Sequence, residues 1–276
     1  MSHKLILRAG VLAFGLLAFL ALTVPPAVTT VPFHYVHHEL LVNARIGGSG
    51  PYTFLLDTGT TPSIIDVALM KRLGLPFEGA AAHGTDIGSG SMKVYPVTLR
   101  AVDIGSLRMS RLDALAVDIS DLGNKLGVHI DGVLGSNFFD GRVVEVNYSC
   151  RTVSVLSDAM LAPVSARFTE NASGYIVTND VWVGPQRASA TIDTGDSGTM
   201  LVTGTGIAAL HLRSAASTGK AVSGISYGGR HRETEGMLPG VRIGSTLLGT
   251  ALSSRGGRFI RHQHRQPNVG TLRRHA

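Results

Sequence analysis

The chain contains one short signature twice, and this repeat limits what the chain can fold into. Phe54–Gly59 has the sequence FLLDTG, and Ala190–Gly195 has the sequence ATIDTG. Each is an apolar run that ends in Asp-Thr-Gly, and the two aspartates lie 136 residues apart. An apolar run followed by Asp and Gly predicts a strand that ends in a turn. A repeat at this spacing predicts two equivalent halves, each of which supplies one carboxylate.

The residues around the two signatures repeat as well. Leu41–Leu56 and Tyr175–Ile192 each predict a hairpin that leads into its aspartate. About 30 residues after each aspartate comes a Gly/Ser-rich segment between strand-like runs, Gly84–Met92 in the first half and Ser223–Gly229 in the second. Short β-branched runs separated by Gly, Pro, Asn and Asp favour a mostly β protein throughout.

These motifs resemble the aspartic protease family, of the pepsin and retropepsin kind. Ile130–Phe139 adds a similarity to that family's apolar-apolar-Gly motif, which braces the aspartate loop. The resemblance implies an all-β, bilobal acid-protease fold of two pseudo-twofold-related, β-barrel-like lobes, with the active site at their junction. We place the first lobe at residues 31–165 and the second at 166–276, with a basic tail from about residue 253.

By the same resemblance, Asp57 and Asp193 form a catalytic dyad. Two adjacent carboxyl groups share one proton, so the ionised member can activate a water and the protonated member can polarise a peptide carbonyl. The substrate is expected to lie extended beneath two flaps, like an added strand. The remaining implied site residues are, in the aspartate loops, Thr58, Gly59, Thr60, Thr194, Gly195 and Asp196; in the flaps, Gly88, Ser89, Gly90, Ser226, Tyr227 and Gly228; and in the loop brace, Leu134 and Gly135.

The residue three places after each aspartate differs between the halves. Thr60 can donate a hydrogen bond to Asp57, whereas ionised Asp196 can only accept. The charge of Asp196 is expected to raise the proton affinity of the dyad and to extend activity toward neutral pH. The alternative is that Asp196 faces solvent and caps a turn.

The second half has no clear counterpart of the brace. The repeat places one near residues 270–274, where only Val269-Gly270 fits. Because catalysis depends on accurate placement of Asp193, a weak or inactive pseudo-protease that binds extended peptides is the main alternative function.

A serine protease is a minor alternative. Gly195–Gly198 has the sequence GDSG, which resembles a serine nucleophile loop, and a triad could be drawn from Ser197, His83 and Asp131. This hypothesis leaves Asp57 and the repeat unexplained.

The N-terminus predicts export from the cytoplasm. Lys4 and Arg8 precede the uncharged run Ala9–Val24, and a cleaved signal peptide and a retained membrane anchor over residues 9–28 both fit this pattern. The leader is placed at residues 1–30, and the catalytic part is expected in the periplasm, outside the cell or anchored to the outer face of a membrane.

Charge and cysteine content exclude other classes. The net charge of +6 comes from six arginines in residues 251–276, so the rest of the chain carries no basic face for nucleic acid. Cys150 is the only cysteine, which excludes an intrachain disulfide, and its strand-like surroundings predict burial. No cofactor or metal motif is apparent, and the oligomeric state stays open.

Overall fold

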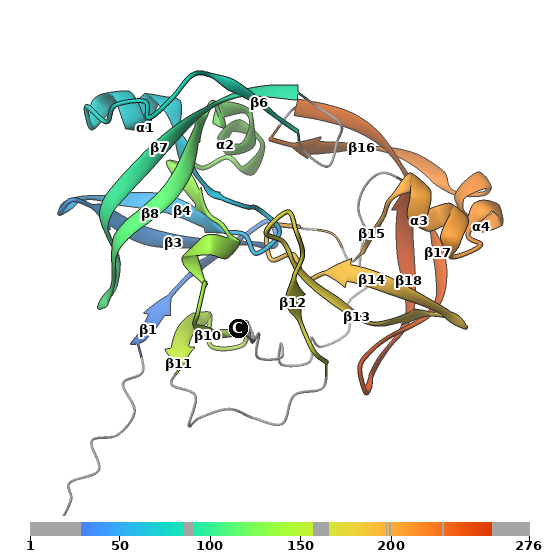
Figure 1. Ribbon diagram of the computed structural model, residues 1–276. Coiled ribbons are helices and arrows are strands. Elements are labelled where there is room, and N and C mark those ends of the chain that lie inside the picture. The colour runs from blue at the N-terminus through green and yellow to red at the C-terminus, as the bar shows by residue number, and fades with distance from the viewer. Residues whose placement is uncertain are drawn as a thin grey trace, which may run out of the picture.

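The computed structural model describes residues 29–85, 91–156, 166–196, 198, 200–227 and 229–255. Strands dominate and the helices are short, so the fold is all-β, as the sequence predicts. Figure 1 shows the strands of the first half, blue to green, on one side of the molecule and most strands of the second half, orange to red, on the other. The aspartate loops lie between these two groups of strands.

The first lobe is built on an eight-stranded sheet, and β3 also pairs with β7. Its strands, in spatial order, are β2 (His34–Val36), β3 (Glu39–Ile46), β4 (Ser49–Leu56), β9 (Gly132–Leu134), β5 (Ser63–Asp66), β8 (Leu107–Val117), β7 (Ser91–Ile104) and β6 (Ala82–Thr85). Two short helices and a 3₁₀ turn follow individual strands: α1 (Val67–Arg72), α2 (Ser120–Leu126) and η1 (Ser136–Phe138).

Strand β4, which leads into Asp57, is buried on both faces near its end. Phe54 and Leu56 belong to the larger core cluster, with Val42 of β3, whereas Leu55 belongs to a second cluster on the opposite face, with Leu41. Side chains alternate between the faces of a strand, so the apolar run before Asp57 contributes to both cores. This packing gives the first aspartate loop a rigid support.

The second lobe is built on a seven-stranded sheet. Its main path runs β12 (Thr169–Glu170), β13 (Ile176–Val183), β17 (Gly229–Ile243), β18 (Thr246–Arg255) and β15 (Leu201–Val202), while β14 (Gln186–Thr191) pairs with β13, and β16 (Lys220–Ser226) pairs with β17. The helices α3 (Gly204–Ala209) and α4 (Arg213–Ser217) lie between β15 and β16 in the sequence. Residues 253–255, which we assign to the basic tail from sequence, form the end of β18.

The two sheets share their pairing pattern except at one place. In each lobe a hairpin leads to the aspartate, β3–β4 or β13–β14, and a long strand pairs with its first member, β7 or β17. The parallel pair β5–β8 corresponds to β15–β18. In the first lobe β9 lies between β4 and β5, whereas among the described residues β14 pairs only with β13. The stretch near residues 270–274, where the repeat places a second brace, lies outside the described residues.

A third, three-stranded sheet joins the start of the described chain to the end of the first lobe, in the order β1 (Thr29–Pro32), β11 (Thr152–Leu156) and β10 (Val143–Asn147). Our expectation that Cys150 is buried is wrong, because its side chain is exposed. Cys150 lies in the turn between β10 and β11, where its backbone N–H donates to the Asn147 side chain at 2.9 Å.

The expected leader, residues 1–30 with its apolar part at 9–28, lies almost entirely outside the described residues. Within the part of the chain that is described, no helix has the length and apolar character needed to cross a membrane.

Candidate active site

The two Asp-Thr-Gly loops meet at the junction of the lobes through reciprocal hydrogen bonds. The Thr58 hydroxyl donates to the carbonyl of Ile192 at 2.6 Å and accepts from the backbone N–H of Thr194 at 3.1 Å. The Thr194 hydroxyl donates to the carbonyl of Leu56 at 2.8 Å and accepts from the N–H of Thr58 at 3.1 Å. Both threonines are buried, so each loop satisfies polar groups of the other.

The glycine of each signature makes room for the aspartate of the other. A side-chain carbon built at Gly59 would collide with the Asp193 carboxyl group, and one built at Gly195 would collide with the Asp57 carboxyl group. This crossed arrangement places the two carboxyl groups against each other. It explains why the tripeptide needs glycine at its third position in both copies.

Asp57 is buried and its carboxylate accepts hydrogen bonds from three donors. Oδ1 accepts from the Gly59 N–H at 2.8 Å, while Oδ2 accepts from the Thr60 hydroxyl at 2.6 Å and from the Tyr227 hydroxyl at 2.5 Å. Donors aimed at a carboxylate stabilise its charged form. Asp57 is therefore well suited to be the ionised member of the pair.

Asp193 is suited to hold the proton. Its pKa is raised well above the usual value for an aspartate, first by burial and then by the charge of Asp57, by a hydrogen bond with Asp57 and by the charge of Asp196. The Asp193 side chain is exposed to solvent, but the protein packed around it still desolvates the carboxyl group. The N–H of Gly195 donates to Oδ1 at 2.9 Å and opposes the rise only in part.

Both of our interpretations of Asp196 describe part of its environment. Its Oδ1 accepts from the Gly198 N–H at 2.8 Å, which is the turn-capping role. Its charge also acts on Asp193 and raises the pKa of that carboxyl group. The turn holds the charge near the dyad, so the two roles are compatible.

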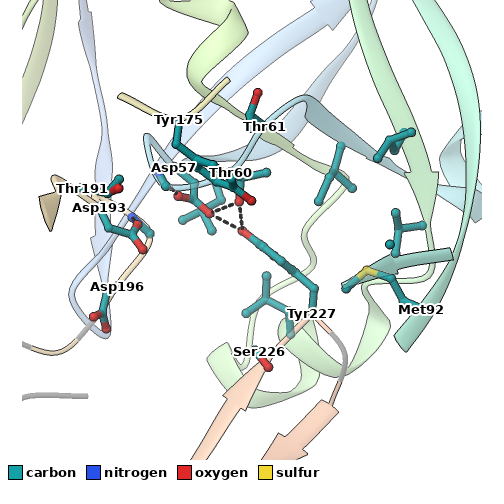
Figure 2. A pocket seen from close by; sticks show the side chains of 18 of the residues that line it. Asp57, Thr60, Thr61, Met92, Tyr175, Thr191, Asp193, Asp196, Ser226 and Tyr227 are labelled. Carbon is teal, nitrogen blue, oxygen red and sulfur yellow. Dashed lines mark hydrogen bonds between the residues drawn. The ribbon is translucent and has the colours of Figure 1, made fainter. Parts of the chain in front are cut away.

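Tyr227 connects the second lobe to the first aspartate. Its ring packs against the apolar cluster of the first lobe, and its hydroxyl points to Asp57 and Thr60 (Figure 2). Burial, followed by the charge of Asp57, raises the pKa of Tyr227 well above its ordinary value, so the hydroxyl stays protonated and can donate. The sequence places Tyr227 in a flap, but gives no sign of this contact.

A cavity of about 570 Å³ opens over the dyad and is lined by both lobes. Asp57 and Asp193 both line it, and Figure 2 shows their carboxyl groups with Asp196 and Tyr227 around this space. Its first-lobe wall is apolar and includes Leu55, Ile64, Met92, Val94, Leu115 and Leu122. Such a cavity, apolar with a few convergent polar groups, is typical of a ligand-binding site.

The flap residues divide between described and undescribed parts of the chain. Hairpin β6–β7 occupies the first flap position, and Gly84 and Met92 line the cavity, but Gly88, Ser89 and Gly90 lie outside the described residues. Hairpin β16–β17 occupies the second flap position, and Ser226 and Tyr227 line the cavity. Gly228 is also outside the described residues.

The first-lobe brace contacts the aspartate loop directly. The carbonyl of Leu134 accepts from the Asp57 N–H at 3.0 Å, and the Ser136 N–H donates to the Thr60 carbonyl at 2.7 Å. A side-chain carbon at Gly135 would lie 2.5 Å from the Thr60 carbonyl oxygen and 3.1 Å from the Ser63 nitrogen. Gly135 therefore allows the brace and the loop to approach closely.

The structure gives no support to the serine triad drawn from Ser197, His83 and Asp131. Asp131 is buried, and its carboxylate contacts the Thr53 N–H at 2.9 Å, Arg72 at 3.3 Å and His129 at 3.1 Å. His83 is exposed on β6, and Ser197 lies outside the described residues. Asp131 thus stabilises the start of the brace.

Sequence analysis missed His231 and Glu233, which also line the cavity. They occupy alternate positions of β17, so they share one face of the hairpin. This alternation was the available signal, but the register that places them opposite β16 depends on how the chain reverses after Ser226.

Comparison with known proteins agrees with this site. Residues 42–138, from β3 through η1, match the family model described as aspartyl protease. This region of the chain is thus similar to the aspartyl protease family, which is the family that its sequence resembles. Among solved structures it is similar to a retropepsin-like aspartic protease from Rickettsia conorii, at 15% identity and a TM-score of 0.34, over 48% of this chain and 93% of that one. A search of curated proteins finds no match.

Proposed function

We propose that this protein is an exported aspartic endopeptidase with Asp57 and Asp193 as its dyad. The contrast between the two carboxyl groups supports this proposal most strongly. Asp57 accepts three hydrogen bonds that favour its ionised form, whereas the pKa of Asp193 is raised. Paired carboxyl groups with opposite protonation are what general acid–base hydrolysis requires.

In the proposed reaction a water lies between the two carboxyl groups, beneath an extended peptide. Asp57 takes a proton from the water as the oxygen attacks the carbonyl carbon of the peptide, and Asp193 donates its proton to the carbonyl oxygen. The tetrahedral intermediate then collapses, the C–N bond breaks, and the amine leaves with the proton held by Asp57. One water is consumed for each peptide bond.

The test is cleavage of a peptide library by the full-length protein, with product masses as the readout. Asp57→Asn and Asp193→Asn are each expected to reduce kcat by about 10³-fold or more, because each removes one partner in proton transfer. Asp140→Asn is the matched control, since Asp140 is exposed and outside the cavity lining. Cleavage that persists in both dyad variants would refute the proposal.

A peptide-binding pseudo-protease is the second candidate function, and the strand pairing of β14 in the described chain supports it. Among the described residues β14 pairs only with β13, whereas β4, which leads into Asp57, also pairs with β9. Saturable binding of library peptides without any product would favour this function.

The leader gives a separate proposal about location. A basic start followed by Ala9–Val24 favours export, with residues 9–28 as signal or anchor. Fractionation of cells that express the full chain tests this proposal: protein that stays in the soluble cytoplasm would refute it.

A further inference from the structure

Three polar side chains of the second flap form a hydrogen-bonded chain that the aspartate mechanism does not use. Ser226 Oγ lies 3.3 Å from His231 Nδ1, and His231 Nε2 contacts Glu233 Oε1. All three residues line the same cavity as the dyad. They come from one hairpin, β16–β17, whose register pairs Gly224 with His231.

The contacts assign the protons in this chain. In the tautomer in which His231 Nε2 carries the proton, this nitrogen donates to the Glu233 carboxylate, which accepts. Neutral His231 then has a free lone pair on Nδ1, which accepts from the Ser226 hydroxyl. This is the order found in serine hydrolases, in which a carboxylate orients a histidine and the histidine deprotonates a serine. The ring nitrogens have exchanged roles here, because Nδ1 faces the serine and Nε2 faces the carboxylate.

The hairpin is shaped to hold these groups. The Glu233 side chain is 2% exposed and the His231 side chain is 11% exposed. A side-chain carbon at Gly224 would collide with both Glu233 and His231, so the glycine makes the space for the pair. Ser226 is half-buried at the end of β16, next to Tyr227 at the cavity (Figure 2).

We propose that Ser226 is a second reactive centre, a nucleophile that is acylated by carboxylic esters, with His231 as its general base and Glu233 as a positioning residue. Ser226 Oγ forms a bond to the ester carbonyl carbon while its proton moves to His231 Nδ1. The bond to the alcohol oxygen breaks, and the alcohol leaves with that proton. A water then releases the acyl group as a carboxylic acid by the same route and restores Ser226.

The walls of the cavity indicate the class of ester. The first-lobe wall is apolar, so it suits an apolar acyl chain. Among the described lining residues four are acidic, Asp57, Asp193, Asp196 and Glu233, and none is lysine or arginine. The expected substrates are therefore neutral or cationic esters with short apolar acyl groups, and anionic esters are disfavoured.

The first test treats the full-length protein with a fluorophosphonate probe and locates the adduct by peptide mass spectrometry. Labelling at Ser226 is expected in the unaltered chain, and Ser226→Ala is expected to abolish it. Ser223→Ala is the matched control, because Ser223 is exposed on the same strand. An absence of adduct at Ser226, or equal labelling of several serines, would overturn the proposal. This readout needs no variant to fold.

The second test measures hydrolysis of p-nitrophenyl butyrate, a neutral ester with an apolar acyl group. His231→Ala is expected to lower the maximal rate by about 10²-fold or more, as for loss of a general base. Glu233→Gln is expected to lower the maximal rate while the half-saturating ester concentration stays constant. A purely structural role for Glu233 predicts that both quantities change, and that result would remove Glu233 from the proposal.

These outcomes are independent of the proposed peptidase. A protein that cleaves peptides but leaves Ser226 unlabelled retains the aspartate dyad and refutes the serine centre. A protein that is labelled at Ser226 but cleaves no peptide retains the serine centre and refutes the proposed peptidase.

Discussion

The two lobes hold their aspartates in different ways. Asp57 follows a strand buried on both faces, its N–H donates to the brace carbonyl of Leu134, and its side chain accepts three hydrogen bonds. Asp193 follows β14, which pairs only with β13 in the described part of the chain, and it lies near a third carboxylate, Asp196. A duplicated fold has thus kept the position of the two acids while their surroundings have diverged.

This difference separates the chemical roles. A carboxylate that accepts several hydrogen bonds holds its charge, and one that faces like charges with few donors holds its proton. Identical environments would leave the two carboxyl groups interchangeable. In the proposed mechanism, the unequal lobes favour Asp57 as the base and Asp193 as the acid.

The largest expected effect concerns the brace. Gly135→Ala is expected to lower the free energy of unfolding by about 2–3 kcal/mol, because the added carbon meets backbone atoms of the aspartate loop. Gly204→Ala in the second lobe is the control, since nothing lies within 4 Å of an added carbon there. Urea denaturation measures the free energy of unfolding of both variants. Equal losses would contradict the expectation that the close contacts at Gly135 cause the larger loss.

Substitutions of Thr58 and Thr194 are expected to lower the free energy of unfolding by similar amounts. Thr58→Val and Thr194→Val each remove one hydroxyl that makes two cross-lobe hydrogen bonds, so each is expected to cost about 1–3 kcal/mol. Thr58→Ser keeps the hydroxyl and is expected to cost less. The double variant should lose less than the sum of the two, because the two hydroxyls hold the same pair of loops together. Additive losses would contradict this account of the junction.

The smallest expected effect is on the pH dependence of cleavage. The charge of Asp196 raises the pKa of Asp193, so Asp196→Asn should lower that pKa. Protonated Asp193 is then lost at lower pH, and the alkaline limb of the kcat/KM profile moves toward acid with little change in the maximum. Asp140→Asn serves as the control for a lost surface carboxylate, and an unmoved limb would leave Asp196 with its turn-capping role alone.

The sequence predicts the parts of this molecule that repeat. The aspartate loops and both flap hairpins follow from local patterns at matching spacings, because turns and strand alternation are encoded by neighbouring residues. The unrepeated β9 follows instead from the apolar-apolar-Gly motif in Ile130–Phe139. Cys150 shows the limit of such patterns, since its strand-like surroundings predict burial, whereas it lies in an exposed turn in which its N–H donates to Asn147.

Contacts between the lobes could not be predicted in this way. The approach of Tyr227 to Asp57 depends on how hairpin β16–β17 packs against the first lobe, 170 residues away in the sequence. The meeting of Ser226 with His231 depends on the register between β16 and β17. Neither pairing has a fixed sequence spacing that a motif could record.

The exchange of hydrogen bonds between Thr58 and Thr194 also has a consequence during synthesis. Domains form from the N-terminus as the chain leaves the ribosome, so the half that contains Asp57 emerges before the half that contains Asp193. Until the later half docks, the earlier loop lacks its partner and no proton can be shared. Under the proposed peptidase mechanism, the nascent chain therefore cannot cleave peptides before its second half has been made.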